Sequence, residues 1–145
     1  MGLPGSGKTT LAGSIVGRLR AEDKTVTWLN ADKIRKQYND MDFSVAGRIR
    51  QSLRMAELAE IDTSDFVIAD FIAPLPEMRE NFNADCTIWV DTIRQGRYPD
   101  TNQLFVPPND YDFRVTEQDA DRWSGLILEQ SSTFSSAAAL LSSFV

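Results

Sequence analysis

The sequence predicts an α/β domain in which a parallel sheet lies between two layers of helices, three layers in all. Short β-rich or apolar runs alternate with segments whose apolar residues recur at helical spacing. A glycine-rich octapeptide with a fixed motif opens the chain at residues 2–9. The length of 145 residues, with 42% hydrophobic and 25% charged content, suits one soluble domain with a sizeable core.

The octapeptide G-L-P-G-S-G-K-T fully matches the phosphate-binding loop G-x-x-x-x-G-K-[ST]. In this motif backbone N–H groups surround phosphate oxygens, the lysine reaches the β/γ-phosphates and the hydroxyl ligates Mg²⁺. Lys8 is therefore a catalytic candidate and Thr9 a metal ligand. A chance glycine-rich turn is the alternative, but a helical pattern follows directly. The expected ATP-binding residues are Gly2, Pro4, Gly5, Ser6, Gly7, Lys8, Thr9 and Thr10.

A phosphate loop ordinarily joins a buried strand to its helix, whereas here Met1 alone precedes Gly2. We expect the first strand, which lies in the middle of the sheet in this fold class, to be missing. We therefore expect residues 1–130 to form an N-terminally truncated P-loop kinase-like domain of low stability. A mid-sheet strand is buried on both faces, so its omission exposes two strand edges.

The first half of the chain predicts one strand among three helices. Apolar residues recur every third or fourth position from 8 to about 22, which indicates a helix with one apolar face. Residues 25–30 (T-V-T-W-L-N) are β-rich and predict a strand. Residues 32–38 look like a short helix. Ser44 suits the N-cap of a helix that runs to about Glu60.

The second half continues the alternation. The runs F-V-I-A-D-F (66–71) and C-T-I-W-V-D (86–91) are typical of buried parallel strands. Prolines open a short helix at 74–82 between them. The remaining predicted elements are a loop at 92–108, a strand at 111–115 and a helix at 117–130.

Residues 131–145 differ from the rest, because they carry six serines, an A-A-A-L-L run and no charge. This low-complexity Ser/Ala tail is interpreted either as a frayed helix or as sequence foreign to the domain.

Composition excludes several functions. The chain has no histidine, which rules out histidine acid–base chemistry and histidine metal ligands. Cys86 cannot form an internal disulfide, which fits a reducing cytoplasm. A net charge of −6 without a basic stripe argues against nucleic acid and membrane as partners. No apolar run approaches the roughly 18 residues of a membrane span.

Two acidic residues follow predicted strands. Carboxyl ends of parallel strands face the ligand crevice in open α/β sheets, so Asp32 and Asp70 should lie on the same side as Lys8. Asp70 could hold Mg²⁺ directly or through water, or simply cap the next turn. Asp32 could orient or deprotonate an acceptor hydroxyl, or cap the following short helix.

Arginines of the helix after Ser44 can be assigned by its period of 3.6. Arg48 and Gln51 fall at one edge of the apolar stripe and can reach a crevice together, whereas Arg50 and Arg54 should point to solvent. Arg48 is thus the better anion-binding candidate and Arg35 a second, since a guanidinium grips phosphate or sulfate at two points. The inward stripe predicted for this helix is Val45, Ile49, Ser52, Leu53 and Ala56.

These motifs together resemble the adenylylsulfate kinase family, which moves the γ-phosphate of ATP to the 3′-hydroxyl of adenosine 5′-phosphosulfate. The similarity spans roughly residues 2–92. Beyond the phosphate loop, L-N-A-D-K-I-R (29–35) resembles the family's Leu-Asp-Gly-Asp-Asn-x-Arg, N-D-M-D-F-S (39–44) its Asn-x-Asp-Leu-Gly-Phe-Ser, F-I-A-P (71–74) its Phe-Ile-Ser-Pro and V-D-T (90–92) its Val-Asp-Thr.

The resemblance implies that the acceptor side is lined by Asp32, Arg35, Asn39, Phe43 and Arg48, with Phe43 stacking on a base. Four positions depart from the family: Gln51 replaces an Asn, Ala73 a Ser, Asn30 the first acid of its motif and Asp70 a small residue.

The expected function is an ATP-dependent phosphotransferase with an alcohol acceptor, adenylylsulfate kinase-like and acting in sulfate assimilation. The expected partners are ATP with Mg²⁺ and a small anionic acceptor, and a homodimer is one assembly to test. The alternatives are a kinase for another small metabolite or nucleotide, and a non-catalytic nucleotide-binding module or inactive fragment.

Overall fold

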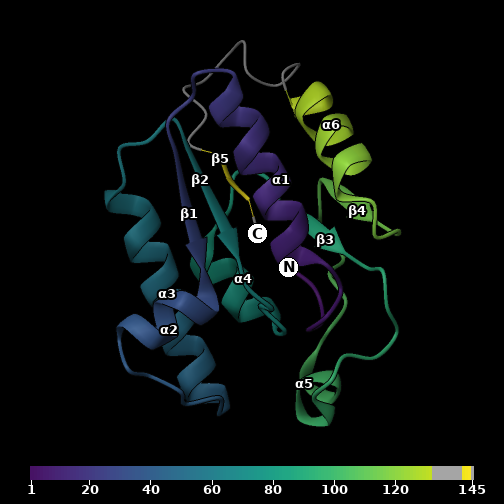
Figure 1. The fold of residues 1–145 in the computed structure, drawn as a ribbon. Coiled ribbons are helices and arrows are strands. Elements are labelled where there is room, and N and C mark those ends of the chain that lie inside the picture. Colours follow the sequence, from purple (N-terminus) through teal and green to yellow (C-terminus); the bar gives the residue numbers. More distant parts are fainter. Residues whose placement is uncertain (132–141, 145) are drawn as a thin grey trace.

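The computed structural model describes residues 1–131 and 142–144. Helices and strands alternate along most of this part of the chain (Figure 1). Their order is α1 (Lys8–Ala21), β1 (Val26–Asn30), α2 (Ala31–Gln37), α3 (Val45–Ile61), β2 (Phe66–Asp70), α4 (Pro76–Phe82), β3 (Ile88–Val90), α5 (Pro99–Leu104), β4 (Phe113–Val115), α6 (Ala120–Ser131) and β5 (Ser142–Phe144).

Each strand pair of the described residues is parallel. β1 and β2 pair over their full lengths, and their last residues, Asn30 and Asp70, are register partners. β3 and β4 form a separate two-stranded ladder. The carboxyl ends of β1 and β2 therefore meet at one edge, beside the phosphate loop.

Two apolar cores lie on the two faces of the sheet. α1 and α6 pack side by side on one face, and α3 and α4 pack together on the other (Figure 1). Neighbouring residues of β2 alternate between the cores, since Val67 and Ala69 join the α3–α4 side while Ile68 joins the α1–α6 side. The predicted α/β class, with helices on both faces of a parallel sheet, is confirmed.

Met1 lies beside β3, and β5 lies beside β2. The Met1 ammonium donates to the Ile88 carbonyl and the Met1 carbonyl accepts from Val90 N–H, each at 2.8 Å. Burial holds the pKa of this ammonium well below its usual value. β5 pairs with the edge of β2 that faces away from β1, from Phe66↔Ser142 to Ile68↔Phe144.

Two expectations for the C-terminal half need correction. The segment 92–108, predicted as a loop, contains the short helix α5, which starts at a proline as helices commonly do. Within the predicted tail, residues 142–144 form a strand rather than a helix, because backbone pairing with β2 outweighs their weak local preference. The rest of the tail interpretation, at 132–141 and 145, falls outside the described residues.

The predicted inward stripe of α3 is correct at three positions and wrong at two. Ser52 is buried and Ile49 and Ala56 pack against the core, whereas Val45 and Leu53 are exposed and Arg48, Gln51 and Met55 are buried instead. The helix packs its small and polar residues toward α4 and the candidate site, and this tertiary contact overrides the apolar pattern. Arg54 is not solvated as predicted, because its side chain contacts Gln51 and Asp40.

Candidate active site

The phosphate-binding loop depends on its glycines at two points. Gly7 is the N-cap of α1 and has a left-handed backbone with φ of 98°, which a larger residue adopts only with strain. Gly2 packs so closely under the loop that a Cβ atom there would collide with the Val90 carbonyl. The loop is therefore seated on the end of β3 and leads directly into α1, whose N-terminal end attracts anions.

Side chains outside the loop hold its carbonyl groups. Thr92 Oγ1 donates to the Ser6 carbonyl, and Gln118 Nε2 donates to the Gly5 carbonyl at 3.1 Å. A trans peptide turns its N–H away from its C=O, so the bond from Thr92 fixes the Gly7 N–H on the opposite side of the loop. Neither Thr92 nor Gln118 was singled out as a site residue from the sequence.

Lys8 extends from the first turn of α1 toward the loop. Its ammonium donates to the Leu3 carbonyl at 2.9 Å. Burial lowers the pKa of Lys8, while the charges of Asp70 and Asp32 act in the opposite direction. The two predicted carboxylates therefore lie close enough to Lys8 to influence its charge.

Asp70 lies at the end of β2 against the phosphate loop. Its Oδ2 accepts from Thr9 Oγ1 at 2.7 Å and from Asn30 Nδ2 at 2.8 Å. A hydroxyl and a carboxylate side by side are the oxygen ligands that Mg²⁺ prefers. Among the described residues no group of three or more acidic or cysteine side chains could hold a metal alone. Mg²⁺ would therefore need phosphate oxygens or waters in addition to Thr9 and Asp70.

A cavity of about 470 Å³ opens between the phosphate loop, the ends of β1 and β2, the α2–α3 connection and α5. Six predicted residues from distant parts of the chain thus face one space together with the loop. The predicted residues among its lining are Pro4, Gly5, Lys8, Thr9, Asp32, Arg35, Phe43, Arg48, Gln51 and Asp70.

Arg35, Phe43 and Arg48 form a cationic and aromatic wall of this cavity. The guanidinium carbon of Arg35 lies 4.5 Å from the Phe43 ring centre, and that of Arg48 lies 5.7 Å from it. Arg48 Nε donates to the Phe43 carbonyl at 2.9 Å. Burial lowers the pKa of both arginines, but a guanidinium stays charged at neutral pH. The wall can therefore receive an anionic molecule that carries a flat ring.

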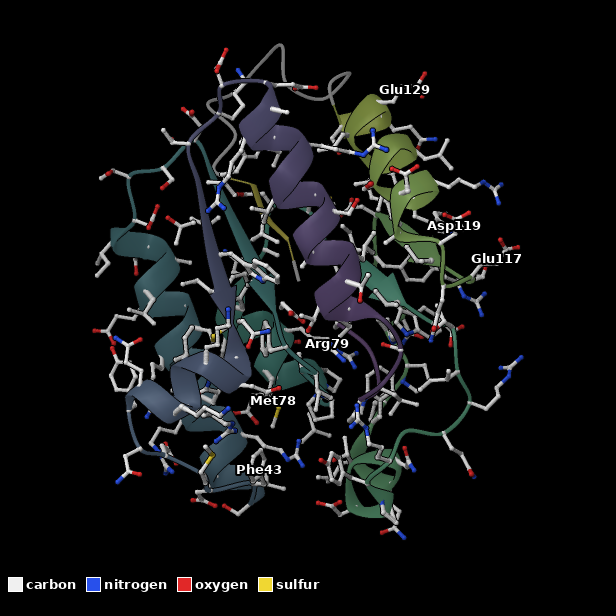
Figure 2. All side chains as sticks on the ribbon, in the orientation of Figure 1. Phe43, Met78, Arg79, Glu117, Asp119 and Glu129 are labelled. Carbon is white, nitrogen blue, oxygen red and sulfur yellow. The ribbon has the colours of Figure 1, made fainter. Side chains whose placement is uncertain are left out.

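Five predicted residues lie outside the lining of this cavity: Gly2, Ser6, Gly7, Thr10 and Asn39. Asn39 is exposed at the end of α2, outside the cavity lining, with a left-handed φ of 49°. Ser6, Gly7 and Thr10 line a second cavity, of about 140 Å³, together with Glu117, Gln118 and Asp119. Figure 2 shows Phe43 beside α2 and Glu117 and Asp119 at the start of α6, on opposite sides of the loop.

The larger cavity also contains residues that sequence reasoning missed. Asp100 and Thr101 enter it from α5, and Tyr98 precedes them. Arg97, an arginine of the segment predicted as a loop, also lines it. The proline-led run P-D-T-N at 99–102 is a helix-start signal that could have revealed α5.

A glycine-rich loop that begins a helix beside the ends of parallel strands defines a phosphate-binding α/β domain of the P-loop class. The family model described as adenylylsulphate kinase matches residues 1–93, well over half of the 145 residues. The chain belongs to this family.

Curated relatives match about half of the chain. The adenylyl-sulfate kinase of Geotalea daltonii is 38% identical over 86 residues, 57% of this chain and 42% of that protein. That of Bacillus licheniformis is 37% identical over 81 residues, 54% of this chain and 41% of that protein. The bifunctional enzyme NodQ of a Rhizobium species is 37% identical over 76 residues, which are 12% of its length. The matched part of the chain thus spans less than half of the length of each of these relatives.

Solved structures share the fold. The Mycobacterium tuberculosis APS kinase CysC, in complex with AMPPNP and APS, superposes with a TM-score of 0.78 at 21% identity. The superposition covers 91% of this chain and 94% of that one.

Proposed function

We propose that this chain is an ATP-dependent kinase that transfers the γ-phosphate to a hydroxyl of a small anionic acceptor, with adenosine 5′-phosphosulfate as the leading acceptor. The observation that carries the proposal is the single cavity that joins Lys8, Asp32, Arg35 and Arg48. A donor site and an anion site that share one space allow direct transfer between two bound molecules.

On the donor side, ATP binds along Gly2–Thr10 with Lys8 at the β/γ-phosphates. Thr9 and Asp70 hold Mg²⁺, which supplies charge neutralisation on the phosphates when it is bound. Thr92 keeps the loop in shape through the Ser6 carbonyl. The smaller cavity beside Gln118 and Asp119 gives the rest of the nucleotide room outside the loop.

On the acceptor side, Asp32 orients the hydroxyl and accepts its proton. Asp32 lies at the first turn of α2 and lines the same cavity as Lys8. Arg35 and Arg48 hold the anionic group, Phe43 stacks on a ring, and Gln51 adds a polar contact. Phosphoryl transfer needs mainly positioning and charge stabilisation, which these groups supply without a covalent intermediate.

Membership of the family supports adenosine 5′-phosphosulfate over other acceptors, since the curated relatives are adenylyl-sulfate kinases. We place the protein in sulfate assimilation in the cytoplasm, and a homodimer is one assembly to test. In the described residues, no helix is long and apolar enough to cross a membrane.

Coupled ADP release, measured with and without adenosine 5′-phosphosulfate, tests the proposal. We expect ADP release that requires both the acceptor and Mg²⁺, and that Lys8→Ala abolishes. Release with adenosine 5′-phosphate or a nucleoside but not with the sulfated acceptor would favour the kinase for another metabolite. ATP binding without any ADP release would favour the alternative of a non-catalytic nucleotide-binding module.

A further inference from the structure

Helix α5 brings a carboxylate to the anion-binding wall of the larger cavity. Asp100 Oδ2 lies 3.6 Å from Arg48 Nη2, and the same nitrogen donates to Thr101 Oγ1 at 3.0 Å. The Arg48 side chain is 7% exposed, whereas that of Asp100 is 67% exposed. A buried cation thus meets a carboxylate that remains free to leave for solvent.

The segment that carries Asp100 is fixed on both sides. The Asn102 amide bonds both the N–H and the carbonyl of Gly96, at 2.7 and 3.1 Å. Val106 N–H donates to the Pro74 carbonyl at 2.8 Å, and Arg79 donates to the Val106 carbonyl. Asp100 is therefore delivered to Arg48 by an anchored helix.

Arg48 has no other carboxylate partner within the described part of the chain. Its Nε donates to the Phe43 carbonyl and its Nη2 donates to the Thr101 hydroxyl, and both of these oxygens are neutral. Burial lowers the pKa of Arg48, and the charge of Asp100 is the force that opposes this effect. The positive charge of Arg48 is thus shared between Asp100 and whatever anion enters the cavity.

We propose that Asp100 is a specificity-determining residue that competes with the anionic group of the acceptor for Arg48. An anion binds only when it replaces the exposed carboxylate, so weakly charged molecules are disfavoured and a group that bonds the guanidinium at two points is favoured. This inference rests on the proposed acceptor role of the cavity.

The first test is steady-state kinetics of Asp100→Asn with adenosine 5′-phosphosulfate. Removing the competing charge should lower the acceptor KM by about 3- to 5-fold, the scale of an exposed ion pair. The KM for ATP should stay unchanged, and inorganic sulfate should become a stronger inhibitor. Asp110→Asn is the matched control, because Asp110 is exposed on the same segment but outside the cavity lining. An unchanged or higher acceptor KM would overturn the proposal.

A second measurement separates this inference from the proposed function. Pyrophosphate binding is titrated calorimetrically with the phosphate loop saturated by AMPPNP and Mg²⁺. Asp100→Asn should bind pyrophosphate about 3- to 5-fold more tightly than the unchanged protein. In an Arg48→Met background that gain should disappear. If adenosine 5′-phosphosulfate is not phosphorylated but the gain is found, the acceptor assignment fails while the role of Asp100 stands. A gain that persists without Arg48, or no gain, refutes the role of Asp100.

Discussion

Asn30 and Asp70 are cross-strand partners at the carboxyl ends of β1 and β2, and the Asn30 amide donates to Asp70 Oδ2 at 2.8 Å. The Asn30 Oδ1 accepts from Lys33 N–H at 3.1 Å and so caps α2. Thr9 donates to the same Asp70 oxygen. One amide therefore orients the carboxylate that faces the phosphate loop and, with its other end, starts the helix that carries Asp32.

Replacing Asn30→Asp should make stability depend on pH and Mg²⁺. The variant keeps an oxygen for the α2 cap but places a second carboxylate against Asp70, and like charges at this distance repel. The melting temperature should fall at pH 7 and recover as the pH is lowered toward 5, because one shared proton removes the repulsion. Added Mg²⁺ should give a similar recovery.

Asn30→Ala is the matched control for this variant. It removes the cap, at a cost of about 1 kcal/mol, and leaves a single carboxylate. Its loss of stability should not vary between pH 5 and 7. If Asn30→Asp showed the same flat profile as Asn30→Ala, the two side chains could not be in contact.

Lys8→Ala should abolish ATP turnover and the rise in melting temperature that ATP·Mg²⁺ produces. The variant removes the positive charge expected at the β/γ-phosphates, and a ligand raises stability only when it binds the folded state. Lys36→Ala, at the exposed end of α2, is the control and should behave as the unchanged protein. Normal turnover by Lys8→Ala would contradict the assignment of the loop.

Arg48→Ala should weaken acceptor binding far more than ATP binding. We expect a loss of about 1.5–3 kcal/mol, the scale of a hydrogen bond to a charged group. Arg50→Ala is a suitable control, since its side chain is half-exposed, pairs with Asp40 and Asp42, and lies outside the cavity lining. The acceptor and ATP KM values of both variants give the comparison, and equal acceptor losses would refute a selective role for Arg48.

Arg54 is less useful as a control than its sequence position suggests. Its guanidinium bonds Gln51 Oε1 at 2.6 Å and Asp40 Oδ2 at 2.9 Å, so Arg54→Ala would also disturb a residue of the cavity lining. The helical period placed Arg48 and Gln51 correctly at the cavity. It did not place Arg54, because Asp40 approaches from a loop whose course no periodicity describes.

The sequence predicts the elements and site residues that local patterns determine, and it fails where contacts distant in sequence determine them. Strand β2, which is apolar and buried on both faces, was predicted to within one residue. Local pattern also located Lys8 and Asp70, since a motif and a strand end fix both. β5 could not be predicted in this way, and the local signal for α5 is limited to its proline-led start. The position of α5 depends on contacts outside the helix, from Asn102 to Gly96 and from Val106 to Pro74. β5 depends on backbone pairing with β2, which is distant in sequence.

Thr92 illustrates such a long-range contact, and Thr92→Val tests its role in the phosphate loop. Thr92 Oγ1 donates to the Ser6 carbonyl, and Val keeps the shape of the side chain while removing that donor. Without it the peptide between Ser6 and Gly7 can rotate, and the Gly7 N–H is no longer held in place for a phosphate. The KM for ATP should rise by about 3- to 10-fold, the value of one ordinary hydrogen bond.

Thr92→Ser separates the hydrogen bond from the loss of packing. The serine variant keeps the hydroxyl and loses only the methyl group, so its KM for ATP and its ATP-induced rise in melting temperature should stay near those of the unchanged protein. The acceptor KM should be similar in both variants, because Thr92 does not line the larger cavity. Equal defects in the serine and valine variants would mean that Thr92 acts through packing and that the bond to Ser6 does not shape the loop.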